Sequence, residues 1–230
     1  MKLMVLVIVL LFTQFGQAQI TEKITVNAGE DISAVLSENG LYLFPSFTKG
    51  VVTMKDGSSV TARMNFNTFL SQIQFIEPQK GDTLVIAHPE KIDSIVLAKT
   101  LFYYNKGYVR VIANYDPAKL IVRQIVSYQP IKKGALGFPT PTVISTENYG
   151  AVPDKINYKL IMDEDILLTK KTFYYLKDKD KGQLSANQSN FLKLFGPGKK
   201  DMEDYIKNNK INFNKEEDLK KLLAWCIQPG

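Results

Sequence analysis

The chain has 230 residues, with 29 basic and 23 acidic side chains and a formal net charge of +6. It contains one cysteine, Cys226, and one histidine, His88. A single cysteine excludes an internal disulfide and a C-x-x-C redox or zinc pair, and a single histidine excludes every site that needs two histidine ligands. The aromatic fraction of 11% favours sheet-rich structure, because flat rings pack well on a pleated surface.

The first 18 residues have the layout of a secretory signal peptide. Lys2 gives a positive start, Leu3–Phe12 is an unbroken apolar run, and Gly16 and Ala18 supply the small residues that a signal peptidase needs. A retained anchor is the alternative, although a membrane-spanning helix needs about 20 apolar residues. We therefore expect export of residues 19–230 to the periplasm or outer surface of a bacterium, with no transmembrane segment left after signal removal.

Loss of Lys2 with the signal peptide lowers the net charge from +6 to +5. Outside the cytoplasm we expect no nucleic-acid partner, and a basic surface would meet anionic lipid or polysaccharide phosphate. The alternative is that this mild excess of charge only keeps the protein soluble.

A series of short strands is predicted for residues 19–131, which we assign to an antiparallel β domain. The clearest signal is a hairpin in which Val51–Lys55 and Ser59–Phe66 flank Asp56-Gly57, a pair that tolerates the positive φ angles of a tight turn. The remaining predicted strands are Gln72–Glu77, Thr83–Ala87, Lys91–Ala98, Thr100–Tyr104, Tyr108–Ala113 and Leu120–Tyr128. Strands at this spacing predict an antiparallel sandwich or open barrel. An outer-membrane barrel is the rival, but it needs strands of about ten residues.

Residues 132–153 are rich in glycine and proline, and we place a loop or linker there. The remainder, 154–230, is predicted to hold two strands, Lys155–Met162 and Thr172–Leu176, followed by helices. The whole chain is thus predicted to be a β-rich α+β protein with a small helix-rich C-terminal part.

Three helical segments are expected near the C-terminus. Apolar residues cluster at 191–195, and Lys199–Asn208 forms a second short helix. Asn214 followed by Glu217 resembles a capping box at the start of the last helix. Apolar side chains then recur at helical spacing, namely Leu219, Leu222, Leu223, Cys226 and Ile227.

Several short motifs, in this order, resemble a group of exported bacterial proteins of unknown function. The group pattern is Y-P-x-F-x-x-G-x-V, a K-D-G turn, N-Y-N, F-I and G-D-x-L. The corresponding segments here are Tyr42-Leu43-Phe44-Pro45-Ser46-Phe47-Thr48-Lys49-Gly50-Val51, Lys55-Asp56-Gly57, Asn65-Phe66-Asn67, Phe75-Ile76 and Gly81-Asp82-Thr83-Leu84. Phe44 is inserted before Pro45, and Phe66 replaces the tyrosine of the pattern. The resemblance implies a location outside the inner membrane and transfers no activity, cofactor or catalytic residue.

No catalytic residue, metal site or cofactor is predicted. A serine or cysteine hydrolase would need His88 as its base, but His88 falls in a predicted turn, and Cys226 lies on the apolar stripe of a helix. A glycosidase needs only two carboxylates about 5–10 Å apart. The acidic candidates for such a pair are Asp163, Glu164, Asp165, Asp116, Glu77 and Asp82. The cluster at 163–165 would also offer oxygen ligands to calcium. Charge clusters at turns are otherwise simply solvated, and no nucleotide-binding motif occurs.

The binding candidates are tyrosines on predicted strands: Tyr103, Tyr104, Tyr174 and Tyr175. Neighbours on a strand face opposite sides, so one member of each pair can face outward. An outward ring can stack on a sugar or anchor a protein, whereas packing in the core is the alternative.

The sequence thus favours an exported cell-envelope protein that binds a protein or a surface glycan without catalysis. A carboxylate-based, glycan-directed hydrolase is the alternative, and neither the ligand nor the oligomeric state follows from the sequence.

Overall fold

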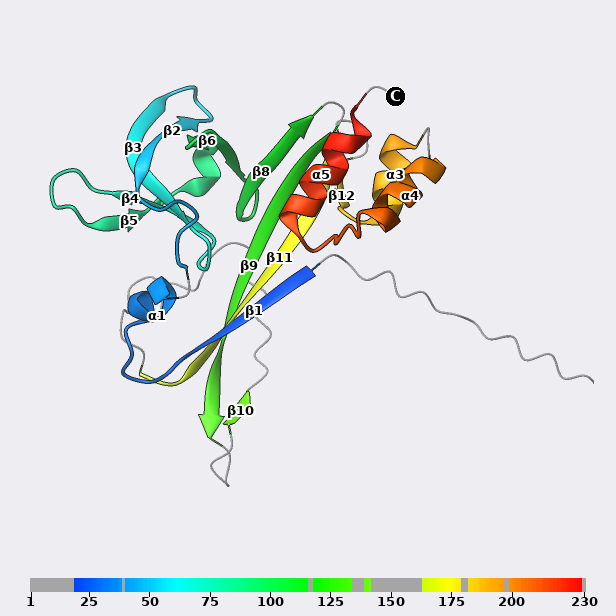
Figure 1. Cartoon of the computed structure of the whole chain (residues 1–230). Helices are drawn as coiled ribbons and strands as arrows, with labels where there is room; N and C mark the ends of the chain where they lie inside the picture. Colours follow the sequence, from blue (N-terminus) through cyan, green and yellow to red (C-terminus); the bar gives the residue numbers. More distant parts are fainter. Residues whose placement is uncertain are drawn as a thin grey trace, which may run out of the picture.

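A large, open antiparallel sheet dominates the computed structural model (Figure 1). The structure describes residues 19–38, 40–115, 118–133, 139–141, 163–178, 182–196 and 199–228. The predicted signal peptide, the strand expected at Lys155–Met162, Asp116 and most of the predicted linker 132–153 lie outside these ranges. The β-rich α+β fold with a helix-rich C-terminal part is confirmed.

The sheet has 12 strands among the described residues, and its main path runs in the order β1-β11-β9-β8-β7-β6-β2-β3-β4-β5. Strand β10 pairs with β9, and β12 pairs with β11. The strands are β1 (Gln19–Val26), β2 (Thr48–Met54), β3 (Ser59–Asn67), β4 (Gln72–Ile76), β5 (Thr83–Val85), β6 (Ile92–Leu97), β7 (Thr100–Tyr104), β8 (Tyr108–Tyr115), β9 (Ala118–Lys133), β10 (Pro139–Pro141), β11 (Ile166–Asp178) and β12 (Gly182–Ser185).

The predicted hairpin is present as β2 and β3. Gly57 has a φ of +88°, a left-handed conformation that glycine adopts without strain. The Asp56 carboxylate accepts a hydrogen bond from the backbone N–H of Ser58 at 2.9 Å. Asp-Gly therefore sets the turn in the way that its chemistry predicts.

Strand β11 joins distant parts of the chain. It lies between β1 and β9 and pairs with β1 at residues 166–173 and with β9 along its whole length. The strand predicted at Thr172–Leu176 is confirmed, but it is longer than predicted, and β1 was not predicted at all. Residues on the two sides of segment 132–153 therefore share one sheet.

The helices are α1 (Ile32–Glu38), α3 (Gln188–Phe195), α4 (Lys199–Asn208) and α5 (Glu216–Cys226), with a 3-10 turn η1 (Pro89–Lys91). Helix α4 has its predicted bounds. The capping box is wrong, because Lys215 is the N-cap residue of α5 and its side chain makes no capping hydrogen bond. Asn214 Oδ1 is instead buried without a hydrogen-bond partner in the described part of the chain.

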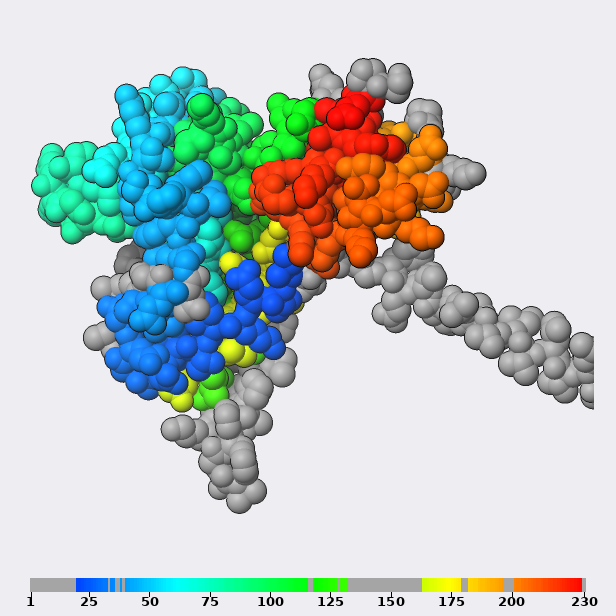
Figure 2. All heavy atoms as spheres, viewed as in Figure 1, coloured from blue at the N-terminus to red at the C-terminus, as the bar shows by residue number. Residues whose placement is uncertain are grey.

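The described helices cover one face of the β1–β11–β9–β8 region, which we call the helix-covered face. Leu219, Leu222 and Leu223 of α5 are fully buried in a cluster with Leu120 of β9 and Leu176 of β11. Figure 2 shows the orange and red helices α3–α5 on one side of the green β8, and the cyan strands β2–β5 forming a lobe on the other side.

The same face is buried at the other end of the long strands. There α1 and Phe69 pack on β1, β9 and β11 around Val26, Val126 and Leu168. The opposite face of these strands carries the candidate site.

Candidate functional site

The structure separates the four candidate tyrosines into two pairs. Tyr103 and Tyr175 pack against the same cluster, formed by Val109, Val111 and Ile121, on the face opposite the helices. Tyr174 belongs to the cluster under the helices, and Tyr104 to the buried cluster that strands β2–β4 and β6–β8 form. Adjacent tyrosines therefore face opposite sides, as the strand geometry predicts.

Tyr103 lies beside two cations. Lys177 of β11 places Nζ 4.6 Å from the centroid of the Tyr103 ring, a distance that permits a cation–π interaction. Burial raises the pKa of the Tyr103 hydroxyl, and the charge of nearby Arg123 only partly offsets this rise. The hydroxyl therefore stays protonated at neutral pH and can donate a hydrogen bond.

The contact between Lys177 and Tyr103 indicates that the sheet curls toward this face. Strands β7 and β11 are separated by β8 and β9, so three strand spacings of about 4.8 Å lie between them. Val109 and Ile121, on the intervening strands, are 0% exposed. Tyr103 and Tyr175 thus cover a small apolar cluster while remaining half-exposed themselves.

Tyr175 stands next to a third aromatic side chain. Its ring is stacked with that of Phe173 at a centroid distance of 6.4 Å. Phe173 is paired in register with Arg123 of β9, so the aromatic and cationic side chains alternate across the same face.

Every charged side chain that register places on this side of β1, β8, β9, β11 and β12 is basic within the described ranges. Lys119 lies opposite Lys177, Arg123 opposite Phe173, and Lys23 opposite Thr169. Alternation along the strands adds one more lysine. We call this side the basic face, with cations Lys23, Lys119, Arg123, Lys171 and Lys177.

None of these cations forms an ion pair with a carboxylate of the described residues. Arg123 is held otherwise, because its Nη2 donates to the backbone oxygen of Asn105 at 2.9 Å. Lys23 and Lys177 are exposed, and the others are half-exposed. Their charges are therefore open to an external anion.

On the helix-covered face the charges are paired. Arg110 donates to both Glu216 oxygens, at 3.2 and 2.6 Å, and Lys170 Nζ lies 2.7 Å from Glu22 Oε2. Burial raises the pKa of Glu216, but the Arg110 guanidinium and the Lys220 ammonium outweigh it and hold this pKa below its ordinary value. Burial also raises the pKa of the Tyr174 hydroxyl.

The nucleophile and base considered from sequence are not part of this face. His88 is exposed in the connection between β5 and η1, where the sequence predicts a turn, and its Nδ1 lies 3.2 Å from Glu90 Oε1. Cys226 is half-buried at the end of α5, and burial raises the pKa of its thiol to about 12. A thiol of that pKa is not a nucleophile at neutral pH.

Two of the acidic candidates, Asp165 and Glu77, have local structural roles. Asp165 accepts a hydrogen bond from the backbone N–H of Ala28 at 2.8 Å, and Glu77 accepts one from that of Lys80 at 3.0 Å. Within the part of the chain that is described, no group of three or more histidine, cysteine or acidic side chains could hold a metal ion. The carboxylate-hydrolase alternative thus gains no support from these contacts.

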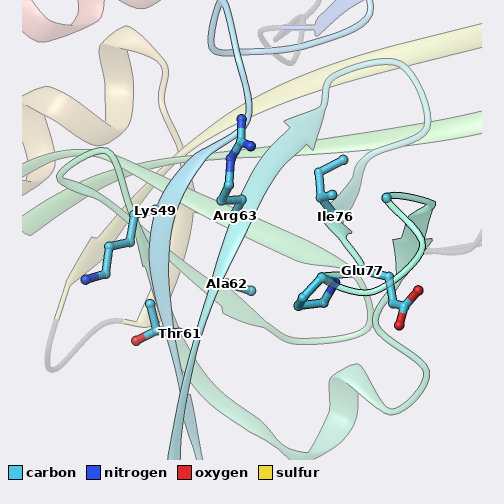
Figure 3. Close-up of a pocket in the computed structure, with 8 residues that line it drawn as sticks. Lys49, Thr61, Ala62, Arg63, Ile76 and Glu77 are labelled. Carbon is cyan, nitrogen blue, oxygen red and sulfur yellow. The ribbon is translucent and has the colours of Figure 1, made fainter.

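An open pocket of about 490 Å³ lies elsewhere, in the lobe of β2–β5. Lys49, Arg63 and Glu77 line it, but their charged ends point in different directions (Figure 3). Specific small-molecule sites have polar groups that converge on the ligand, so we do not place the function here.

The basic face has a signal in the sequence that our prediction missed. Lys171, Phe173, Tyr175 and Lys177 occur at every second residue, which places them on one side of a strand. Restricting the predicted strand to Thr172–Leu176 left both lysines outside it.

No helix in the described ranges is long and apolar enough to cross a membrane. Comparisons with protein-family models, curated proteins and solved structures found no match for this chain.

Proposed function

We propose that the protein is an exported, non-enzymatic component of the bacterial envelope that binds a glycan through the basic face. The observation that carries the proposal is the gathering of Tyr103, Phe173 and Tyr175, from strands far apart in sequence, on one half-exposed side of the sheet. Aromatic rings offer an apolar surface on which a sugar ring can stack.

Hydrogen-bond donors surround these rings, as a glycan with many hydroxyl groups requires. The Tyr103 hydroxyl is protonated, Lys177 lies over its ring, and Arg123 is close enough for its charge to act on the hydroxyl. A protein partner is the other class considered. Protein interfaces bury a desolvated apolar centre, whereas here the most apolar residues, Val109 and Ile121, are already covered by the chain itself.

Binding of the purified protein to a panel of immobilised polysaccharides tests the proposal. Tyr103→Leu and Tyr175→Leu keep apolar packing but remove the rings, and we expect each to weaken binding by about tenfold, as base-stacking aromatics do in other polymer-binding proteins. Tyr115→Leu is the matched control, because Tyr115 is 39% exposed and lies on the helix-covered side. Equal losses in all three variants would contradict the assignment of the site.

Turnover and export have separate tests. Release of reducing ends from any bound polysaccharide by the purified protein would replace the proposal with the hydrolase alternative.

Export is tested by N-terminal sequencing of the protein recovered from the cell envelope, which should give a chain that begins at Gln19. Recovery only from the cytoplasm with Met1 intact would contradict export.

A further inference from the structure

We propose that the ligand of the basic face is a polyanionic glycan, a polymer of sugars bearing carboxylates or phosphates, which lies along β9 and β11. This inference rests on the proposed function and specifies the chemistry of its ligand. The observation behind it is the row of basic side chains on this face. Stacking of a sugar on aromatic rings does not by itself require these charges.

The sign of the charge is uniform over the described part of the face. Lys23, Lys119, Arg123, Lys171 and Lys177 occupy four strand registers on three strands, and no aspartate or glutamate falls on the same side. A solvated surface ordinarily mixes both signs, whereas a surface of one sign attracts ligands of the opposite sign.

The two lysines at one end make the arrangement unfavourable for the free protein. Lys119 and Lys177 are directly opposite each other on β9 and β11. Like charges in this position repel across the strands. A bound anion near both would relieve the repulsion, and no described carboxylate does so.

The length of the face indicates a polymer. Lys171 and Lys177 are six residues apart on β11, which corresponds to about 20 Å at the rise of a strand. The aromatic side chains Phe173 and Tyr175 lie between these lysines. A chain with alternating sugar faces and anionic groups would contact both kinds of side chain at once.

An anionic membrane is the other ligand that a basic face could meet. Binding at a bilayer surface also uses apolar side chains that enter the lipid. The exposed large apolar residues in the described ranges are Val51, Val60, Leu84, Val85, Val96 and Tyr115. Register places Val51 and Val96 on the same side as Leu101 and Tyr103, but on β2 and β6, and none of the six is on β1, β9 or β11, the strands that carry the lysines. The structure therefore favours the glycan.

The test compares polygalacturonate with its fully methyl-esterified form, which has the same backbone without the charge. We expect the full chain to bind polygalacturonate at least about tenfold more tightly at low salt, and this preference to shrink as salt rises. Phosphatidylglycerol vesicles serve as the membrane probe.

Lysine substitutions test whether the polymer binds to the basic face. The triple substitution Lys119→Gln, Lys171→Gln and Lys177→Gln should weaken polygalacturonate binding by about tenfold and flatten its salt dependence. The control removes as many charges from exposed lysines of the helical part, with Lys193→Gln, Lys207→Gln and Lys221→Gln, and should change binding less than about twofold.

The outcomes separate this inference from the proposed function. Equal binding of the two polymers, weakened about tenfold by Tyr103→Leu, would overturn the anionic ligand and leave glycan binding standing. Vesicle binding that is stronger than polymer binding and lost in the basic-face triple variant would overturn the glycan in favour of the membrane. No binding of either polymer, together with no binding in the polysaccharide panel, would remove both proposals.

Discussion

The two faces of the β1–β11–β9–β8 region differ in how their charges are compensated. Under and beside the helices, Lys170 is paired with Glu22, and Arg110 with Glu216. On the basic face, Lys119, Lys171 and their neighbours have no described carboxylate partner. On the helix-covered face each buried charge needs a partner, because an unpaired buried charge is costly. On the basic face the charges are solvated, so they need no partner in the protein and can bind a ligand.

Strand β11 contains both environments in adjacent residues, which makes the comparison testable. Leu168 is 0% exposed on the helix-covered side, and Leu167 is half-exposed on the basic side. Leu168→Ala should lower the free energy of unfolding by about 2–5 kcal/mol, and Leu167→Ala by less than about 1 kcal/mol. Denaturant unfolding monitored by circular dichroism measures both. Equal losses would mean that the basic face is covered as thoroughly as the other.

Adjacent lysines give the corresponding comparison for charge. Lys170 is 7% exposed, its Nζ lies 5.8 Å from the Phe69 ring centroid, and it is paired with Glu22. Lys170→Ala should cost about 1–3 kcal/mol of unfolding free energy, whereas Lys171→Ala should change it by no more than about 0.5 kcal/mol. The contrast fails if Lys171→Ala is the more damaging substitution in the same unfolding assay.

Acid should weaken the ion pair on the helix-covered face, whereas the basic face has no described ion pair to lose. The pKa of Glu216 is lowered by Arg110 and Lys220 from its ordinary value of 4.5, so its ionised form stabilises the fold. That contribution is complete above pH 4.5 and is lost as pH falls through the lowered pKa of the folded state. Between pH 7 and pH 3 the wild type should therefore lose about 1 kcal/mol more stability than Glu216→Gln. Urea unfolding at the two pH values compares the proteins, and identical losses would show that this pair contributes nothing.

The smallest effect concerns the repulsion on the basic face. Lys119→Thr removes one lysine of the pair with Lys177 and should raise the unfolding free energy by about 0.2–1 kcal/mol at low salt. The gain should shrink at high salt, where the repulsion is screened. Lys23→Thr is the control, because its cross-strand partner is Thr169. A gain as large in the control would contradict a specific Lys119–Lys177 repulsion.

Local signals in the sequence predicted the elements that local chemistry determines. Asp56-Gly57 predicted the β2–β3 hairpin, and the bounds of β7 and α4 followed from the alternation and helical spacing of their own residues. The capping box failed because Asn214 and Glu217 match the pattern by type, while Glu217 pairs with Lys220 at 3.1 Å instead of reaching back.

The arrangement of the site depends on pairings that no local signal reveals. Tyr103 and Tyr175 meet one cluster only because β11 inserts between β1 and β9, far from β7 in sequence. The four tyrosines were equivalent candidates in the sequence, and tertiary structure alone decides that Tyr103 and Tyr175 share a face. The net charge of +6 likewise gave no indication that unpaired lysines gather on one side of the sheet.

Lysine footprinting tests most directly whether the basic face is the binding surface. The purified protein is acetylated with and without polygalacturonate, and modification is quantified at each lysine by mass spectrometry. We predict protection of Lys23, Lys119, Lys171 and Lys177 and unchanged modification of Lys207 and Lys221, which are exposed on α4 and α5. Protection that is uniform, or that is confined to the helices, would contradict the account.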